Sequence, residues 1–201
     1  MNNKQSILDI TPSDSKGVNL TLNRIKKALE VLGSPCKGIP AIQIVGTNGK
    51  GSIASFLENC LIEAGINIGC TTSPHLFDWC ERIRVKGEKI SSQDLKNLIL
   101  KVQKSSKNLS EFELVIASAL YYFSIKKVNL IILEAGLGGR LDATTAHPNR
   151  PLIAIGSIGL DHCQYLGETL EQITKEKGAV ISTGSVVISS RQDEQVTKIL
   201  E

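Results

Sequence analysis

The sequence lacks any long apolar segment. It contains no run of about 18 apolar residues, the length a membrane-spanning helix needs. The first residues, MNNKQSILDITPSDSKG, have no apolar core of the kind that marks a signal peptide. From the sequence we therefore expect a cytoplasmic protein that makes no contact with a membrane.

Paired cysteines and clustered charges are also missing. The five cysteines (Cys36, Cys60, Cys70, Cys80 and Cys163) form no C-x-x-C pair, which argues against a disulfide scaffold or a cysteine metal site and fits a reducing compartment. The net charge is only +3, and the basic residues are spread along the chain. This pattern does not suggest nucleic-acid binding, and it permits a small anionic ligand, which needs only local positive charge.

What the chain does contain is an alternation of strand and helix patterns over its 201 residues. Helical periodicity occurs in residues 19–32, 53–64, 95–102, 110–125 and 170–177. Short apolar runs at 42–45, 66–70, 129–133, 152–155 and 186–189 predict strands, and residues 83–90 predict a hairpin. This order predicts an α/β fold, with a mostly parallel sheet covered by helices on both faces.

One loop lies between the first predicted strand and the helix at 53–64. It reads GTNGKGS, a variant of the phosphate-binding loop G-x-x-x-x-G-K-[ST]. Glycines let successive N–H groups point at one anion, the lysine adds a charge for phosphates, and the serine can approach Mg²⁺ or a phosphate oxygen. The alternative is an ordinary strand-to-helix turn. The candidate nucleotide-binding residues are Gly46, Thr47, Asn48, Gly49, Lys50, Gly51 and Ser52.

A second candidate segment is LEAGLGGRLDATT, at residues 133–145. An apolar strand that ends in an acid resembles a Walker-B arrangement, so Glu134 is a candidate Mg²⁺ ligand at the same sheet edge as the glycine loop. The alternative is an exposed acid at a strand end. Arg140 and Asp142 either contact substrate or pair with each other.

Histidines follow two further predicted strands. His162 ends the segment SIGLDH after the strand at 152–155, where a neutral imidazole can bind a metal. His75 follows Ser73 and Pro74 in TTSPH, a segment that an ordinary turn explains equally well. His147, in a polar loop, is a weaker candidate.

Six segments in order resemble the folylpolyglutamate synthase/dihydrofolate synthase family of the Mur ligase superfamily. They are GTNGKGS (46–52), TSPHL (72–76), ERIRV (81–85), EAGLGGRLDAT (134–144), SIGLDH (157–162) and KEKGAVI (175–181). The resemblance implies a Mur-ligase-like P-loop ATPase domain. It also implies ATP-dependent ligation of L-glutamate to a folate or dihydropteroate carboxylate through an acyl phosphate.

The resemblance also implies roles for individual residues. Lys50 and the loop amides hold the ATP phosphates, while Ser73, Glu134 and His162 bind two Mg²⁺ ions. Lys50, His162 and Lys177 form the catalytic set, with Lys177 carbamylated. The pterin substrate is expected near TSPHL and ERIRV, and the candidate substrate residues are Pro74, His75, Arg82, Arg140 and Asp142.

The chain departs from the family in two ways. Family members usually read EKAG where residues 176–179 read EKGA, which leaves an unmodified surface lysine as the alternative for Lys177. Members are also longer and carry a C-terminal Rossmann-like domain. We therefore expect residues 19–201 to be an incomplete ATP-binding domain that lacks this partner domain and self-associates. Residues 1–18 are polar, and we expect them to be a flexible segment.

Three alternative functions stay open at this stage. The first is a truncated, non-catalytic remnant that binds nucleotide or pterin. The second is another Mur-type ligase with a peptide acceptor, against which the TSPHL and GLGGRLDAT segments argue. The third is an unrelated P-loop ATPase, which would have no need of the SIGLDH and KEK segments.

Overall fold

The computed structural model describes residues 19–106 and 108–201. The flexible segment expected at residues 1–18 lies outside these described residues. Among the described helices, none combines the length and apolar content that a membrane crossing requires.

The fold is built on one sheet with the strand order β4-β3-β2-β5-β1-β6-β7. Strands β2, β5, β1, β6 and β7 are parallel, and the β3–β4 hairpin joins antiparallel at the β2 edge. The mostly parallel sheet predicted from the sequence is therefore confirmed. The strands are β1 (Ala41–Val45), β2 (Ile68–Thr71), β3 (Ile83–Val85), β4 (Glu88–Lys89), β5 (Leu130–Glu134), β6 (Leu152–Ile155) and β7 (Val186–Ser189).

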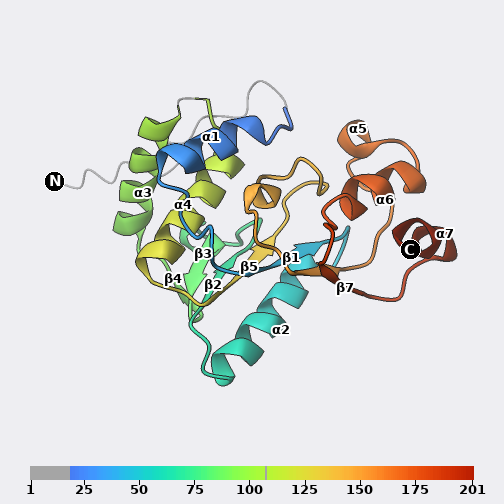
Figure 1. Ribbon diagram of the computed structural model, residues 1–201, viewed down its shortest axis with the longest axis horizontal. Coiled ribbons are helices and arrows are strands. Elements are labelled where there is room, and N and C mark those ends of the chain that lie inside the picture. The colour runs from blue at the N-terminus through green and yellow to red at the C-terminus, as the bar shows by residue number, and fades with distance from the viewer. Residues whose placement is uncertain (1–18, 107) are drawn as a thin grey trace.

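Helices alternate with the strands in Figure 1. The α-helices are α1 (Asn23–Val31), α2 (Lys50–Glu63), α3 (Ser92–Ser105), α4 (Glu111–Ile125), α5 (Cys163–Leu166), α6 (Leu170–Gly178) and α7 (Glu194–Leu200). The 3₁₀ segments are η2 (Trp79–Arg82) and η3 (Ala143–Ala146). The short elements α5, η2 and η3 were not predicted, because one turn of helix leaves no periodic pattern to detect.

Local signals account for two helix starts. The Ser110 hydroxyl accepts from the N–H of Glu113, and the Glu113 carboxylate accepts in return from the N–H of Ser110, which forms the predicted capping box of α4. At α3, the Ser91 hydroxyl accepts from the N–H of Asp94, the forward half of that predicted motif. These hydrogen bonds satisfy N–H groups that a helix start otherwise leaves unpaired.

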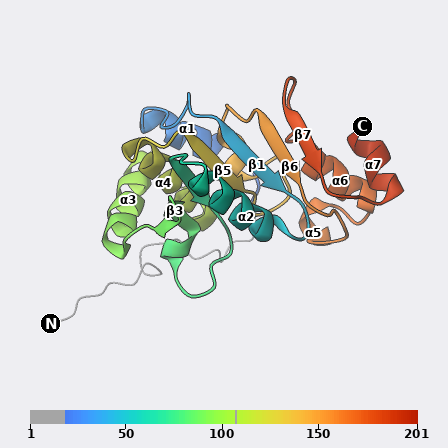
Figure 2. The ribbon, with the colours of Figure 1, turned by 90° about the horizontal axis from the view of Figure 1, so that it is seen from below.

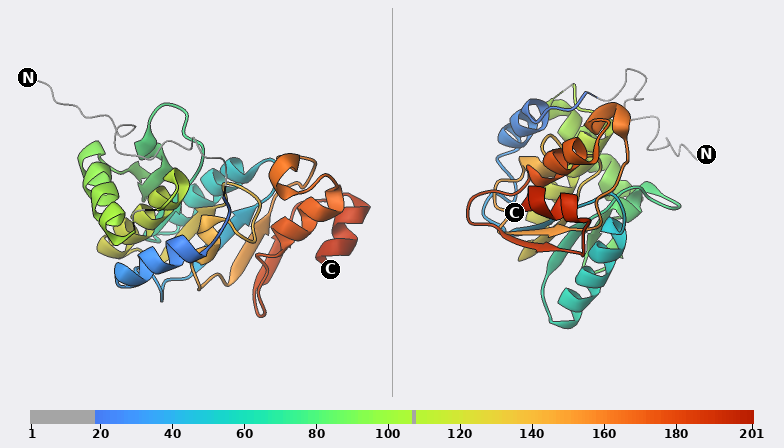
Figure 3. Two further views of the ribbon diagram at one scale, coloured as in Figure 1. Left: turned by 90° about the horizontal axis from the view of Figure 1, so that it is seen from above. Right: turned by 90° about the vertical axis from the view of Figure 1, so that its right-hand side faces the viewer.

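The two faces of the sheet are covered unequally. On one face α2 packs alone over the side chains of Ile42, Ile44 and Ile132, and Figure 2 shows it in front of β5 and β1. Helices α1, α3 and α4 cover the opposite face at one end, and α5, α6 and α7 cover it at the other, as Figure 3 shows from two further directions. Helices therefore lie on both faces, as predicted, but one face carries a single helix.

Close packing on the crowded face depends on one glycine in β2. A Cβ atom at Gly69 would lie 2.6 Å from the ring of Phe123 on α4. Such a contact is too short for any side chain, so glycine is required for α4 to approach the sheet. This packing fixes the sheet from which the functional loops extend.

Candidate functional site

The largest cavity described lies at the carboxyl edge of the parallel strands and has a volume of about 640 Å³. Ligands of open α/β sheets bind at this edge, because the loops after neighbouring strands converge there. The cavity is lined by Thr47, Asn48, Gly49, Lys50, Gly51, Ser52, Ser55, Glu58, Asn59, Thr72, Ser73, Pro74, Leu76, Glu81, Arg84, Gly87 and Glu134. Six of the seven predicted loop residues are among them.

The glycine loop is held against the loop that follows β6. The N–H groups of Thr47 and Asn48 both donate to the carbonyl of Ser157, at 2.7 and 3.3 Å. Gly46 has φ of 147°, and a Cβ there would lie 3.0 Å from the backbone of Gly156. Glycine is therefore required at position 46 both for its backbone conformation and for this close approach.

The start of α2 is open to a ligand. Gly49 adopts the left-handed conformation at the N-cap, with φ of 80°, and no side chain among the described residues caps this end. The Lys50 ammonium folds back over the loop and donates to the carbonyls of Gly46 and Thr47, at 3.0 and 3.2 Å. Free first-turn N–H groups, the positive helix end and one lysine make an anion site suited to phosphates.

Glu134 ends β5 beside this loop and is 3% exposed, so the alternative of an exposed strand-end acid is wrong. Its Oε2 accepts from the backbone N–H of Ser73 at 2.9 Å. Burial raises the pKa of Glu134 above its ordinary value, while the Ser73 N–H and the Lys50 charge oppose that rise. The buried carboxylate is thus next to both the phosphate loop and Ser73.

The donors around Glu134 suit Mg²⁺. Gly51 lies directly beside this carboxylate, because a Cβ there would be in van der Waals contact with Glu134 Oε1 at 3.6 Å and with Oε2 at 3.8 Å. No group of three His, Cys, Asp or Glu side chains within the described ranges could hold a metal. Mg²⁺ needs no such group, since it binds through one or two carboxylates together with substrate phosphates and water.

Lys177 lies beneath the glycine loop. Its side chain is 3% exposed, so the alternative of a surface lysine is wrong, and its ammonium donates to the carbonyl of Gly46 at 2.9 Å. Burial, and then the nearby Lys50 charge, lower the pKa of Lys177 from 10.5 to about 8. Lys50 and Lys177 therefore share one carbonyl acceptor, although 127 residues of sequence separate them.

His162 is placed differently from Ser73 and Glu134. It occupies the N-cap position of α5 in the left-handed conformation but makes no side-chain cap hydrogen bond, and its half-exposed side chain has Nε2 3.5 Å from the Asp161 carboxylate. It does not line the 640 Å³ cavity. The structure thus brings Ser73 and Glu134 together directly and leaves His162 at the loop after β6.

Arg140 and Asp142 do not pair with each other. Arg140 forms a partly exposed ion pair with Glu176, with Nη2 and Oε1 2.9 Å apart. Asp142 is buried, and its two oxygens accept from the N–H groups of Gly136, Leu137 and Thr144 and from the Thr144 hydroxyl. The alternative of a mutual pair is wrong, because Arg140 pairs with Glu176 and Asp142 accepts hydrogen bonds from its own loop.

The remaining predicted substrate residues, Pro74, His75 and Arg82, lie within the loop at residues 72–82. His75 Nδ1 accepts from Arg82 Nε at 2.9 Å, and the Arg82 guanidinium lies 4.3 Å from the ring centroid of Trp79. Pro74 lines the large cavity, whereas His75 and Arg82 do not. His147 is buried and bonded to the carbonyl of Ile39, away from the cavity.

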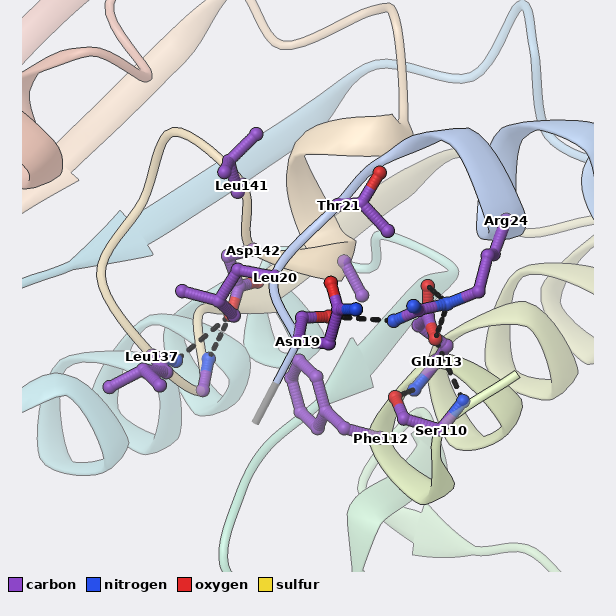
Figure 4. A pocket seen from close by; sticks show the side chains of 12 residues that line it. Asn19, Leu20, Thr21, Arg24, Ser110, Phe112, Glu113, Leu137, Leu141 and Asp142 are labelled. Carbon is purple, nitrogen blue, oxygen red and sulfur yellow. Dashed lines mark hydrogen bonds and ion pairs between the residues drawn. The ribbon is translucent and has the colours of Figure 1, made fainter. Parts of the chain in front are cut away.

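A second cavity of about 250 Å³ lies beside the segment that follows β5. Figure 4 shows Leu137 and Leu141 on one side of it and the Arg24–Glu113 ion pair on the other. Phe112 also contributes to its lining. The segment after β5 that lines this cavity begins at Gly136, two residues after Glu134. Apart from Asp142, sequence reasoning missed its lining, because residues 19–24, 110–113 and 136–143 meet only in the fold.

Sequence reasoning also missed Glu58 and Arg84, which line the large cavity and form a buried ion pair at 2.7 Å. Arg84 lies in the ERIRV segment, but its residue type alone does not distinguish it from Arg82. Glu58 lies in the middle of α2, where nothing in the sequence distinguishes it from a surface acid.

Comparison with known proteins gives a consistent family. No protein-family model matches the chain. The dihydrofolate synthase/folylpolyglutamate synthase of Bacillus subtilis is 37% identical over 194 residues, which is 92% of this chain and 45% of the relative. The E. coli FolC structure in complex with DHPP and ADP has a TM-score of 0.86 and 33% identity, and the match covers 92% of this chain and 45% of that one.

A third match is an FPGS-AMPPCP-folate complex, with a TM-score of 0.90 and 29% identity over all of this chain and 51% of that one. The chain thus spans about half the length of these relatives, and the match falls on their N-terminal domain. Over that span, the chain is similar to the N-terminal domain of dihydrofolate synthase/folylpolyglutamate synthases.

Proposed function

We propose that this chain forms the nucleotide-binding half of an enzyme that uses ATP to ligate L-glutamate to a folate or dihydropteroate carboxylate. The observation that supports this proposal most directly is the open, glycine-lined start of α2, where Lys50 folds over the loop and the buried Glu134 lies beside it. Support also comes from the relatives, whose structures are named as complexes with ADP, AMPPCP and folate.

In this proposal the phosphates of ATP bind at residues 46–52. The Lys50 ammonium leaves the loop carbonyls for the phosphates, and the N–H groups of the first turn of α2 donate to phosphate oxygens. ATP phosphorylates the acceptor carboxylate, and the amine of L-glutamate then displaces phosphate from the acyl phosphate. The protein contributes mainly by positioning groups and neutralising charge.

Glu134 and Ser73 would hold Mg²⁺, with His162 as a third candidate at the neighbouring loop. When bound, Mg²⁺ neutralises phosphate charge and orients the transferred phosphoryl group. The contribution of Glu134 is a carboxylate held in place by the Ser73 N–H. This hydrogen bond fixes the carboxylate before any ligand arrives.

Lys177 fits the proposed carbamylation chemically. Only a neutral amine reacts with CO₂, and burial lowers the pKa of Lys177 to about 8, so that more of the amine is neutral near physiological pH. Carbamylation would replace a buried cation with an anion beside Lys50, which removes the repulsion between the two lysines. Loss of the modification in CO₂-depleted buffer, followed by intact mass, tests this proposal.

We place the pterin group in the 250 Å³ cavity rather than beside TSPHL and ERIRV. Apolar side chains line one side of this cavity, and a carboxylate–guanidinium pair lies on the other side (Figure 4). Such a lining suits a flat ring with hydrogen-bonding groups along one edge. The half-buried Leu141 allows a test. Leu141→Ser should weaken dihydropteroate binding and leave nucleotide affinity unchanged, and equal pterin affinity in both proteins would reject this placement.

The function is tested by incorporation of labelled L-glutamate into dihydropteroate or tetrahydrofolate with ATP and Mg²⁺. The 201-residue chain is assayed beside Lys50→Ala. Incorporation that disappears in Lys50→Ala supports the ligase proposal. Mg²⁺-dependent nucleotide binding without incorporation would limit this chain to nucleotide binding, and absence of both activities would contradict the proposal.

A further inference from the structure

Arg84 joins three elements at one end of the large cavity. Its Nη1 donates to the Thr72 hydroxyl at 2.9 Å and to the carbonyl of Glu81 at 2.7 Å. Thr72 and Glu81 are the two ends of the loop that carries Ser73, so a single guanidinium nitrogen bridges the base of that loop, beside the backbone hydrogen bond from the Thr72 N–H to the carbonyl of Arg82.

The same guanidinium is anchored on the phosphate-loop helix. Its Nε and Nη2 both donate to Glu58 Oε2, at 2.9 and 2.7 Å. Glu58 lies on α2, two turns after Lys50, and its side chain is 5% exposed, against 19% for Arg84. The other carboxylate oxygen, Glu58 Oε1, has no hydrogen-bond partner among the described residues. Arg84 is therefore the group that balances this buried charge.

We infer that Arg84, anchored by Glu58, is a positioning residue that sets the distance between Ser73 and the phosphate-binding end of α2. Ser73 directly follows Thr72 and donates its N–H to Glu134. A fixed loop base thus keeps Ser73 and Glu134 at a constant distance from Lys50. This inference rests on the proposed function, because it concerns how that nucleotide site acquires its Mg²⁺ dependence.

Such a link predicts a selective defect. Without Arg84 the glycine loop keeps its own contacts to Ser157 and Gly159, so the phosphate site itself stays formed. The loop that carries Ser73 loses the two side-chain bonds at its base and keeps only the backbone bond between Thr72 and Arg82 there. Residues that do not bind a metal themselves but hydrogen-bond to its ligands commonly contribute about 10–100-fold to metal affinity.

The experiment measures the affinity for AMPPCP by calorimetry, first in EDTA and then across a Mg²⁺ titration. The main variant is Glu58→Met/Arg84→Met, which removes both charges together and leaves no unpaired buried ion. Arg84→Lys is the second variant, because it keeps the charge opposite Glu58 but cannot bridge Thr72 and Glu81. Lys89→Met is the matched control, because it removes an exposed ion pair between the same hairpin and Asp78, in the loop that carries Ser73, and leaves Arg84 in place.

The unaltered chain and Lys89→Met should show the same Mg²⁺ midpoint. The double variant and Arg84→Lys should need about tenfold more Mg²⁺ or higher, with affinity in EDTA within about twofold of the unaltered chain. An unchanged midpoint in either folded variant overturns the inference, as does an equal loss of affinity with and without Mg²⁺. If the unaltered chain fails to bind AMPPCP, the proposed function fails, and the inference fails with it.

Discussion

The glycine loop at 46–52 and the loop at 136–145 both follow central strands and both contain motif residues, but their polar groups are used differently. In the first, α2 starts without a side-chain cap and Lys50 bonds only to backbone carbonyls. In the second, the Asp142 carboxylate accepts from three backbone N–H groups and the Thr144 hydroxyl. The first loop has donors free for a ligand, whereas the second has used its acid to fix its own shape.

A motif residue can therefore serve a loop in two ways, and the sequence does not distinguish them. Hydrogen-bond accounting does, because a carboxylate with several internal donors has little capacity left for substrate. Asp142 therefore shapes the wall of the smaller cavity, and its predicted contact with substrate stays a prediction.

The sharpest test of this contrast is Asp142→Ala. It leaves three buried N–H donors unpaired, and each such donor costs about 1–3 kcal/mol, so we expect the free energy of unfolding to fall by about 3–5 kcal/mol. Urea unfolding measures this change. Arg140→Ala is the control, because its exposed pair with Glu176 should contribute about 0–1 kcal/mol. Equal effects of the two variants would contradict the contrast.

Lys177 predicts a pH dependence beneath the first loop. Its pKa is about 8 in the folded chain and ordinarily 10.5, so between these values the unfolded chain binds more protons. Stability should therefore rise with pH across this window, by about 3 kcal/mol relative to Lys177→Met. Chemical denaturation in CO₂-depleted buffer from pH 7.5 to 10.5 measures the difference. Parallel pH profiles for the two proteins would reject the buried cation.

Glu134→Gln separates function from stability. Burial raises the folded-state pKa of Glu134, so the ionised side chain destabilises the fold at neutral pH. The unaltered chain should lose stability relative to Glu134→Gln as pH rises from 4.5 through the raised pKa, and the variant should be the more stable at pH 7. Thermal unfolding and Mg²⁺-dependent nucleotide binding together test this, and a variant that is less stable at pH 7 would contradict it.

The smallest expected effect concerns the face of the sheet that carries only α2. Val186 and Ile188 on β7 are 59% and 58% exposed, and their register with Leu152 and Ala154 places them on that face. We expect weak, concentration-dependent self-association, reduced by Val186→Thr/Ile188→Thr. Phe56→Ser, at an exposed position on α2, is the control. A monodisperse monomer in sedimentation at all concentrations would contradict this.

The sequence predicted the features that depend on neighbouring residues. Apolar runs predicted the five parallel strands, and Ser110 with Glu113 predicted the start of α4, because periodicity and capping are local. The glycine loop was found at its strand–helix junction for the same reason.

Features that depend on tertiary contacts could not be predicted. The contact of Lys177 with Gly46 spans 131 residues, and the partner of Arg140 is Glu176, 36 residues away, and not Asp142, its close neighbour in the sequence. The unequal covering of the sheet arises because the connections after β6 and β7 place α6 and α7 on one face. No pattern within a single segment records that choice.

The central claim, a phosphate site built by residues 46–52 at the start of α2, is tested most directly by nucleotide affinity. AMPPCP binding with Mg²⁺ is measured by calorimetry for the unaltered chain, for Lys50→Ala and for Lys175→Ala, a control at an exposed lysine paired with Glu171. We predict that Lys50→Ala weakens binding by about 10–100-fold, equivalent to a charge-assisted hydrogen bond of about 1.5–3 kcal/mol, while Lys175→Ala binds normally. Equal affinity in all three proteins, or binding by none, would contradict the account.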